Sequence, residues 1–81
     1  SEMRWIPVTE KLPENGLCGY SENVLITYEI NGARRVATAT LQRTEVRGKN
    51  VVRWKTTFAG RILEYKVIAW MPFPEPYKEG D

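Results

Sequence analysis

Apolar and polar residues alternate along most of the chain, a pattern typical of β-strands with one buried face. Two such segments, residues 24–30 and 33–41, are separated only by Asn31 and Gly32. An Asn-Gly pair accepts the positive φ angles that a type I′ turn requires at both central positions. The sequence therefore predicts a β-hairpin over residues 24–41.

The two-residue turn also fixes which residues of this hairpin face one another. On one face the predicted pairs are mostly apolar: Ile30 with Ala33, Tyr28 with Arg35, Ile26 with Ala37 and Val24 with Ala39. The other face places Glu29 opposite Arg34 and Leu25 opposite Thr38. The opposite-charge pair indicates that this face is the more solvent-exposed one. We expect the apolar face to form part of the core.

A second hairpin is predicted around Ala59 and Gly60. A two-residue loop there pairs Trp54 with Tyr65, Val52 with Val67, Thr56 with Leu63, Lys55 with Glu64 and Arg53 with Lys66. The last pair is like-charged, so its members are either solvated separately or share a bound anion. Residues 44–50, which contain the sequence Arg-Gly-Lys, are expected to connect the two hairpins.

These segments predict a mainly β fold, a small antiparallel meander of four to five strands curled into a partial barrel. Residues 5–8 supply an edge strand, because Pro7 has no N–H for a second neighbour. We expect one domain over residues 3–76 and a disordered tail over residues 77–81. The predicted core is Trp5, Val24, Ile26, Tyr28, Ile30, Ala37, Ala39, Val52, Trp54, Leu63, Tyr65, Val67 and Trp70.

The composition changes this picture little. With 81 residues, 42% hydrophobic and 27% charged, the chain fits a single soluble domain. The lone Cys18 allows no internal disulfide, and no stretch has the features of a signal peptide, so we expect a cytoplasmic protein. The apolar runs fall short of the roughly 18 residues that a membrane span needs.

The charge distribution supplies the best functional lead. Nine of the twelve Lys and Arg residues lie between residues 34 and 66, whereas eight of the ten acidic residues lie outside that range. A basic stripe along the second hairpin and its turn suits nucleic-acid phosphates. The candidate residues are Arg43, Arg47, Lys49, Arg53, Lys55 and Lys66.

An ordinary solvated surface is the favoured alternative, with the acidic ends of the chain folded back over the stripe. Trp54 and Tyr65 serve as base-stacking platforms only if they face solvent. Their predicted pairing turns both rings toward the core instead. Nucleic acid is therefore the second choice of partner.

Catalytic chemistry is poorly supported. The chain contains no histidine and only one cysteine, which excludes Ser-His and Cys-His nucleophiles and a typical zinc site. Residues 45–49 hold one glycine and lead into a strand, so they form no glycine-rich phosphate loop. We expect no catalytic residue, no metal and no cofactor.

Each end of the chain carries a Trp two residues ahead of a Pro. Trp5-Ile6-Pro7-Val8 precedes Leu12-Pro13, and Trp70-Met71-Pro72-Phe73-Pro74-Glu75-Pro76 lies near the C-terminus. With residues 24–28, this pattern resembles domain-of-unknown-function family 551. The resemblance implies a short protein of phages, prophages or bacteria, and it brings no activity. The motif residues expected to be structural are Trp5, Pro7, Leu12, Pro13, Trp70, Met71, Pro72, Pro74 and Pro76.

The proline-spaced residues 72–76 either dock on another protein as a polyproline II segment or lie against their own domain. The apolar side chains of Trp70, Met71 and Phe73 favour the second alternative. As function we predict a non-enzymatic module that binds a protein, or a second copy of itself, through a sheet edge or the tail. Nucleic acid is the alternative partner and an enzyme the third hypothesis; neither a membrane nor a metal is expected.

Overall fold

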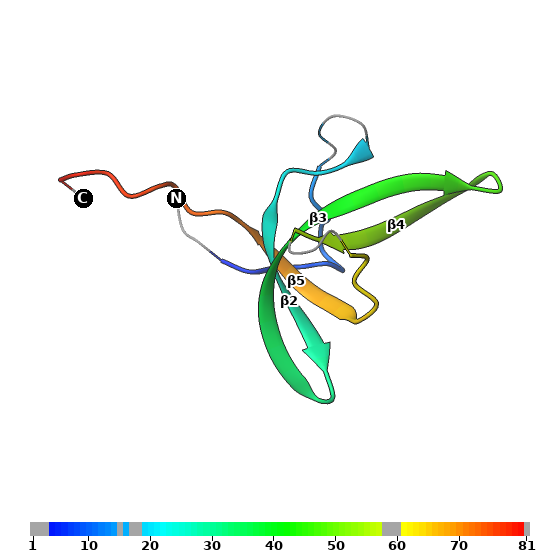
Figure 1. The fold of residues 1–81 in the computed structure, drawn as a ribbon, viewed down its shortest axis with the longest axis horizontal. Helices are drawn as coiled ribbons and strands as arrows, with labels where there is room; N and C mark the ends of the chain where they lie inside the picture. The colour runs from blue at the N-terminus through cyan, green and yellow to red at the C-terminus, as the bar shows by residue number, and fades with distance from the viewer. Residues whose placement is uncertain (1–3, 15, 17–18, 58–60, 81) are drawn as a thin grey trace.

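Five antiparallel β-strands form one curled, half-barrel sheet in the computed structural model, which describes residues 4–14, 16, 19–57 and 61–80 (Figure 1). The strands are β1 (Ile6–Pro7), β2 (Val24–Ile30), β3 (Ala33–Val46), β4 (Lys49–Thr56) and β5 (Lys66–Pro72). Their order across the sheet is β1-β5-β2-β3-β4. The mainly β, antiparallel fold class predicted from the sequence is confirmed.

The first predicted hairpin is confirmed residue by residue. Asn31 and Gly32 have φ angles of 51° and 79°, as a type I′ turn requires. Strands β2 and β3 pair in the predicted register, from Ile30 opposite Ala33 to Val24 opposite Ala39. The Asn31-Gly32 turn therefore determines the register of the whole β2–β3 pairing.

The second predicted hairpin is wrong, because β4 pairs with β3 and not with the strand that follows it. β3 continues for 14 residues, so its first half pairs with β2 and its second half with β4. The turn between β3 and β4 is Arg47-Gly48, with φ angles of 52° and 78°. This turn lies inside the connection predicted over residues 44–50, but it is shorter, because β3 extends to Val46 and β4 begins at Lys49. An arginine at positive φ is uncommon.

Strand β5 returns to the far side of β2, where it sits between β2 and β1. Its register sets Tyr28 opposite Val67 and Glu29 opposite Lys66. The predicted pairs Trp54–Tyr65, Val52–Val67, Thr56–Leu63, Lys55–Glu64 and Arg53–Lys66 are therefore wrong. The proposed turn residues Ala59 and Gly60 lie outside the described residues.

The returning segment still touches β4 before it reaches β5. Thr56 donates its backbone N–H to the Arg61 carbonyl, and Leu63 donates to the Trp54 carbonyl, both over 2.7 Å. These contacts cover the last residues of β4 on its outer edge. They are local, whereas the long-range pairing of β5 with β2 determines the topology.

The predicted N-terminal edge strand is confirmed. Among the described strands β1 pairs only with β5, with Ile6 opposite Trp70 and Pro7 opposite Ala69. Val8 extends the contact by donating its backbone N–H to the Ile68 carbonyl over 3.1 Å. The two Trp-Pro ends of the chain therefore lie side by side at one edge of the sheet.

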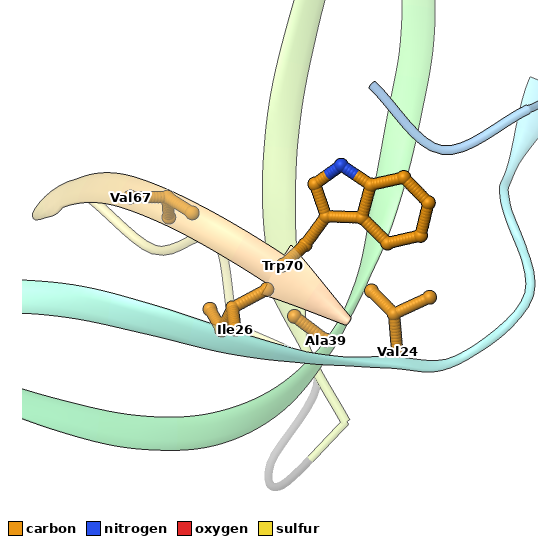
Figure 2. Packing of buried hydrophobic residues seen from close by; sticks show 5 residues of the cluster. All are labelled: Val24, Ile26, Ala39, Val67 and Trp70. Atoms are coloured by element: carbon orange, nitrogen blue, oxygen red, sulfur yellow. The ribbon is translucent and has the colours of Figure 1, made fainter. Parts of the chain in front are cut away.

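The core gathers on one face of the central strands. Figure 2 shows its buried side chains, with the Trp70 indole beside the side chains of Val24, Ile26, Ala39 and Val67. Ile6, Val8, Tyr28, Ala37, Trp54 and Leu63 pack around this cluster, half-buried. Most of the predicted core is thus confirmed.

Ile30, also predicted in the core, is half-buried and lies outside the core cluster. Four other differences from the predicted core have physical causes. Leu41 is fully buried although it was not predicted, because β3 continues past the first hairpin and keeps Leu41 on the same face as Ala39. Trp5, Val52 and Tyr65 were predicted to be buried, but 37%, 49% and 50% of their surfaces are exposed. Each of the three lies at the margin of the sheet rather than at its centre.

Candidate nucleic-acid interface

The second half of β3 and the facing part of β4 form a two-stranded arm, residues 43–52, with Arg47-Gly48 at its tip. Pairing with β2 ends at Val24 opposite Ala39, and an isolated bridge between Tyr20 and Gln42 is the last contact of that kind. Beyond it, β3 and β4 pair only with each other in the described part of the chain. Figure 1 shows the arm, in green, extending away from the rest of the sheet.

The base of the arm is fixed to the N-terminal loop through Arg43. Its Nη2 donates to the Pro13 carbonyl over 2.6 Å. Gly19, at a φ of 77°, brings the loop so close that a Cβ there would lie 2.9 Å from the Arg43 carbonyl oxygen. Arg43 is therefore a structural residue on the core side of the sheet.

Cations lie on the opposite side of the β3–β4 pair, both on the arm and at its base, because residues of a strand alternate between the two faces. Trp54 packs on the core, so the alternate residues Lys49, Val51, Arg53 and Lys55 of β4 face outward. Their cross-strand partners on β3 are Val46, Thr44, Gln42 and Thr40. We call these eight residues the basic face; it holds three cations and no acidic side chain.

Arg47, Lys49 and Arg53 are exposed, and they form no ion pair with any residue that the structure describes. Lys55 is half-buried, and its Nζ lies 5.7 Å from the centre of the Tyr20 ring. A cation over an aromatic face is held in place without being neutralised. The tip and the basic face thus carry four positive charges that form no ion pair with a described carboxylate. Glu45, the acidic residue of the arm, lies on its other face, opposite Asn50.

The predicted stripe is therefore only partly assembled. Arg47, Lys49, Arg53 and Lys55 lie together on the arm and along β4. Arg43 points to the other face, and Lys66 starts β5, separated from β4 by β2 and β3. Lys66 lies opposite Glu29, which also faces Arg34 across 3.8 Å, so that part of the sheet is balanced in charge.

No ion pair joins a carboxylate of the acidic ends to the basic face among the described residues. Glu10 pairs with Arg4 at 3.3 Å, and Glu75 pairs with Lys78 at 3.5 Å. Both partners in each pair come from the same end of the chain. Glu10 and Glu75 are thus paired within the ends of the chain and not with the arm.

The motif residues of the two ends meet around a shallow hollow of about 350 Å³. Trp70 donates its indole N–H to the Lys11 carbonyl over 2.8 Å, and Pro13 is buried nearby. The lining comprises Lys11, Pro13, Glu14, Gly16, Glu22, Val24, Trp70 and Pro72. Trp70 thereby ties the last strand to the loop after β1.

The expectation that the tail lies against its own domain is wrong beyond Pro72. Residues 72–80 are exposed, including 48% of Phe73 and 83% of Tyr77. Figure 1 shows this segment, in orange and red, running away from the sheet on the side opposite the arm. Pro74 and Pro76 therefore pack on no core residue that the structure describes.

A feature that sequence reasoning missed lies at the other end of the sheet. The rings of Tyr28 and Tyr65 stack with centroids 5.9 Å apart and planes inclined by 24°. Arg35 lies directly opposite Tyr28 on β3 and is exposed. Only the unpredicted return of β5 to β2 brings Tyr65 to Tyr28, so no local sequence signal marks this pair.

The described residues offer neither a metal centre nor a membrane-spanning helix. Within residues 4–14, 16, 19–57 and 61–80, no group of three or more His, Cys, Asp or Glu side chains is placed to hold a metal ion. The same part of the chain contains no helix of the length and hydrophobicity needed to cross a membrane.

Comparison with known proteins supports the resemblance seen at the two ends of the chain. The model of a family described as proteins of unknown function (DUF551) matches residues 4–78, nearly the whole chain. No curated protein and no solved structure matches this chain. The matched range includes the arm, the hollow and the stacked tyrosines, so all three belong to the family domain.

Proposed function

Because the chain belongs to the DUF551 family, which has no assigned activity, we propose a function from its own geometry: a non-enzymatic module that binds nucleic acid through the β3–β4 arm. The observation that carries the proposal is the basic face together with the arm tip. Its cations are exposed or lie over an aromatic ring, and they form no ion pair with a described carboxylate.

Phosphate binding needs cations that can displace counterions, and those of Arg47, Lys49 and Arg53 are available. Thr40, Gln42 and Thr44 flank them on β3 and supply neutral hydrogen-bonding groups, which also contact phosphates in many complexes. The arm projects from the sheet, so a long anionic partner reaches it without meeting the rest of the protein. The chemistry and the shape therefore point to the same ligand.

The first test is the salt dependence of binding to a fluorescently labelled oligonucleotide, followed by anisotropy between about 50 and 200 mM salt. Each phosphate contact contributes about 0.7 to 0.9 to the slope of log affinity against log salt. We expect the double variant Lys49→Ala/Arg53→Ala to bind more weakly and to show a slope that is shallower by about 1.4 to 1.8.

The matched control is Arg4→Ala/Lys78→Ala, which removes the same charge from two cations that pair with carboxylates at the chain ends. This control is expected to keep most of the slope. The proposal is refuted if the native chain binds no oligonucleotide at low salt, or if both double variants change the slope equally.

A protein partner is the second candidate, and the exposed tail favours it. Phe73 and Tyr77 are aromatic side chains on a proline-spaced segment that extends from the domain. Such a segment suits an aromatic groove on another protein, or on a second copy of this chain. An accessory protein of a phage or bacterium, acting in the cytoplasm, would use either partner.

A pull-down from a bacterial lysate, with Phe73→Ala/Tyr77→Ala as the comparison, tests this candidate. Binding through the tail predicts a partner that survives moderate salt with the native chain and is absent with the variant. A partner retained by both chains would place the contact elsewhere, and an empty pull-down counts against the candidate.

A further inference from the structure

Tyr65 presents an aromatic surface that the packing of the domain leaves half open. It lies just before β5, and 50% of its surface is exposed. Its ring stacks on Tyr28 of β2, at 5.9 Å between centroids. Tyr28 covers one face of the ring, and half of the residue's surface is accessible to a ligand.

The residue beneath Tyr65 is part of the packed sheet. Tyr28 is half-buried against the core cluster of β2, β3 and β5, and the register fixes it opposite Val67. Stacking on Tyr28, with planes inclined by 24°, sets the orientation of the Tyr65 ring and leaves its other face as the outer surface of the pair. Flat aromatic surfaces of this kind are platforms for nucleic-acid bases, because every base has a π-face.

A cation lies near the stacked pair of Tyr65 and Tyr28, which we call the platform. Arg35 is the cross-strand partner of Tyr28, and it is exposed without an ion pair among the described residues. Directly opposite residues in an antiparallel sheet have Cβ atoms about 5 Å apart. Arg35 thus lies next to Tyr28, on the side of β2 away from β5, and its long side chain supplies a cation near the stacked pair.

The platform and the basic face contribute different chemistry. The eight residues of the basic face include no aromatic side chain, and the Tyr20 ring next to them has Lys55 Nζ over it. The basic face therefore supplies mainly contacts to the nucleic-acid backbone. Strand alternation puts Tyr28 and Arg35 on the core side of the sheet, opposite to the basic face. A stiff duplex, with a persistence length of about 50 nm, cannot bend around a sheet edge to meet both.

We propose that Tyr65, backed by Tyr28 and flanked by Arg35, stacks an unpaired base, so that the preferred ligand is single-stranded nucleic acid. This inference rests on the proposed function and names its substrate class. The single strand passes from the basic face over a sheet edge to the platform. Duplex nucleic acid reaches only the arm and binds more weakly.

The experiment compares a labelled 20-nucleotide oligothymidine with a duplex of the same length, using the native chain and Tyr65→Ala. We expect the variant to bind the single strand about 5- to 150-fold more weakly, the range for one base–aromatic stack, at an unchanged salt slope. Duplex affinity is expected to stay the same. Tyr65→Phe keeps the ring and should bind like the native chain.

The matched control is Tyr77→Ala, which removes an exposed tyrosine that no described ring covers. Circular dichroism checks that each variant folds. Tyr65→Leu keeps apolar bulk over Tyr28 but has no π-face, so it should weaken binding as Tyr65→Ala does even if the alanine variant is unstable.

The outcomes separate the two proposals. Equal affinities of Tyr65→Ala, Tyr65→Leu and Tyr77→Ala for the single strand would overturn the stacking platform, as would tighter binding of the duplex by the native chain. In both cases, a shallower salt slope for Lys49→Ala/Arg53→Ala would still support nucleic-acid binding by the arm. Absence of binding to both oligonucleotides at low salt would overturn the platform and the arm together.

Discussion

At the scale of single residues, the fold depends on a few turn positions with positive φ, which some residue types accept readily and others only at an energetic cost. Asn31 and Gly32 agree with their positive φ angles, and the first hairpin forms as expected. Arg47 conflicts with its φ of 52°, since this conformation costs a residue other than Gly, Asn or Asp roughly 1 kcal/mol or more. A charged residue thus occupies a strained turn position where stability alone favours asparagine.

This conflict gives a prediction in which stability and binding move in opposite directions. Arg47→Asn should raise the free energy of unfolding by about 0.5–1 kcal/mol, because Asn accepts the left-handed conformation of a type I′ turn. Urea denaturation measures it as a higher midpoint at an unchanged m-value. If Arg47 contacts phosphate, the same variant should lower the salt slope of oligonucleotide binding by about 0.7 to 0.9.

The control is Arg53→Asn, which removes the same charge from a strand position without positive φ. Asn is disfavoured in strands, so this variant should be slightly less stable than the native chain. Equal shifts of the midpoint in both variants would mean that charge, and not turn conformation, sets the stability of this region.

At the scale of elements, the accuracy of the sequence-based predictions follows the range of the interactions. The turn at Asn31-Gly32 determined the β2–β3 register because two residues suffice to specify a tight hairpin. The edge position of β1 followed from the missing N–H of Pro7. Both features are local, and both were predictable.

The pairing of β5 was not predictable in this way, because it joins residues that are far apart in the sequence. Val67 lies opposite Tyr28, and nothing in the residues between them specifies that partner. The hairpin hypothesis around Ala59 and Gly60 chose the nearest strand, whereas burial of Val67 and Trp70 against Ile26 requires the more distant one. Apolar packing across β2 outweighed sequence proximity.

The candidate sites likewise divide into features set by local sequence, which were predictable, and features set by long-range strand pairing, which were not. Composition located the basic segment, and alternation along β4 correctly grouped Lys49, Arg53 and Lys55 on one face. The predicted neighbour Lys66 and the buried position of Tyr65 both depended on the wrong strand pairing. The stacked tyrosines became visible only with the true topology.

At the scale of the whole molecule, stability is expected to be uneven. β2 is flanked by β5 and β3 and carries Ile26, which has no exposed surface. The arm has no third strand beside it in the described residues, and Val46 and Val52 are 42% and 49% exposed. Regions with few buried apolar contacts open at a lower free energy than the core.

Native-state hydrogen exchange tests this gradient and the proposed function in one measurement. The hydrogen-bonded amides of β2 and β5 should exchange only through global unfolding, whereas those of residues 43–52 should exchange through local opening at a lower free energy. Adding a single-stranded oligonucleotide should slow exchange in the arm, because a ligand that binds only the closed arm stabilises it by mass action. The β2–β3 turn, which lies outside the basic face, is the internal reference. Uniform exchange in β2 and the arm would contradict the gradient; an arm left unprotected by a bound oligonucleotide would exclude it as the contact surface.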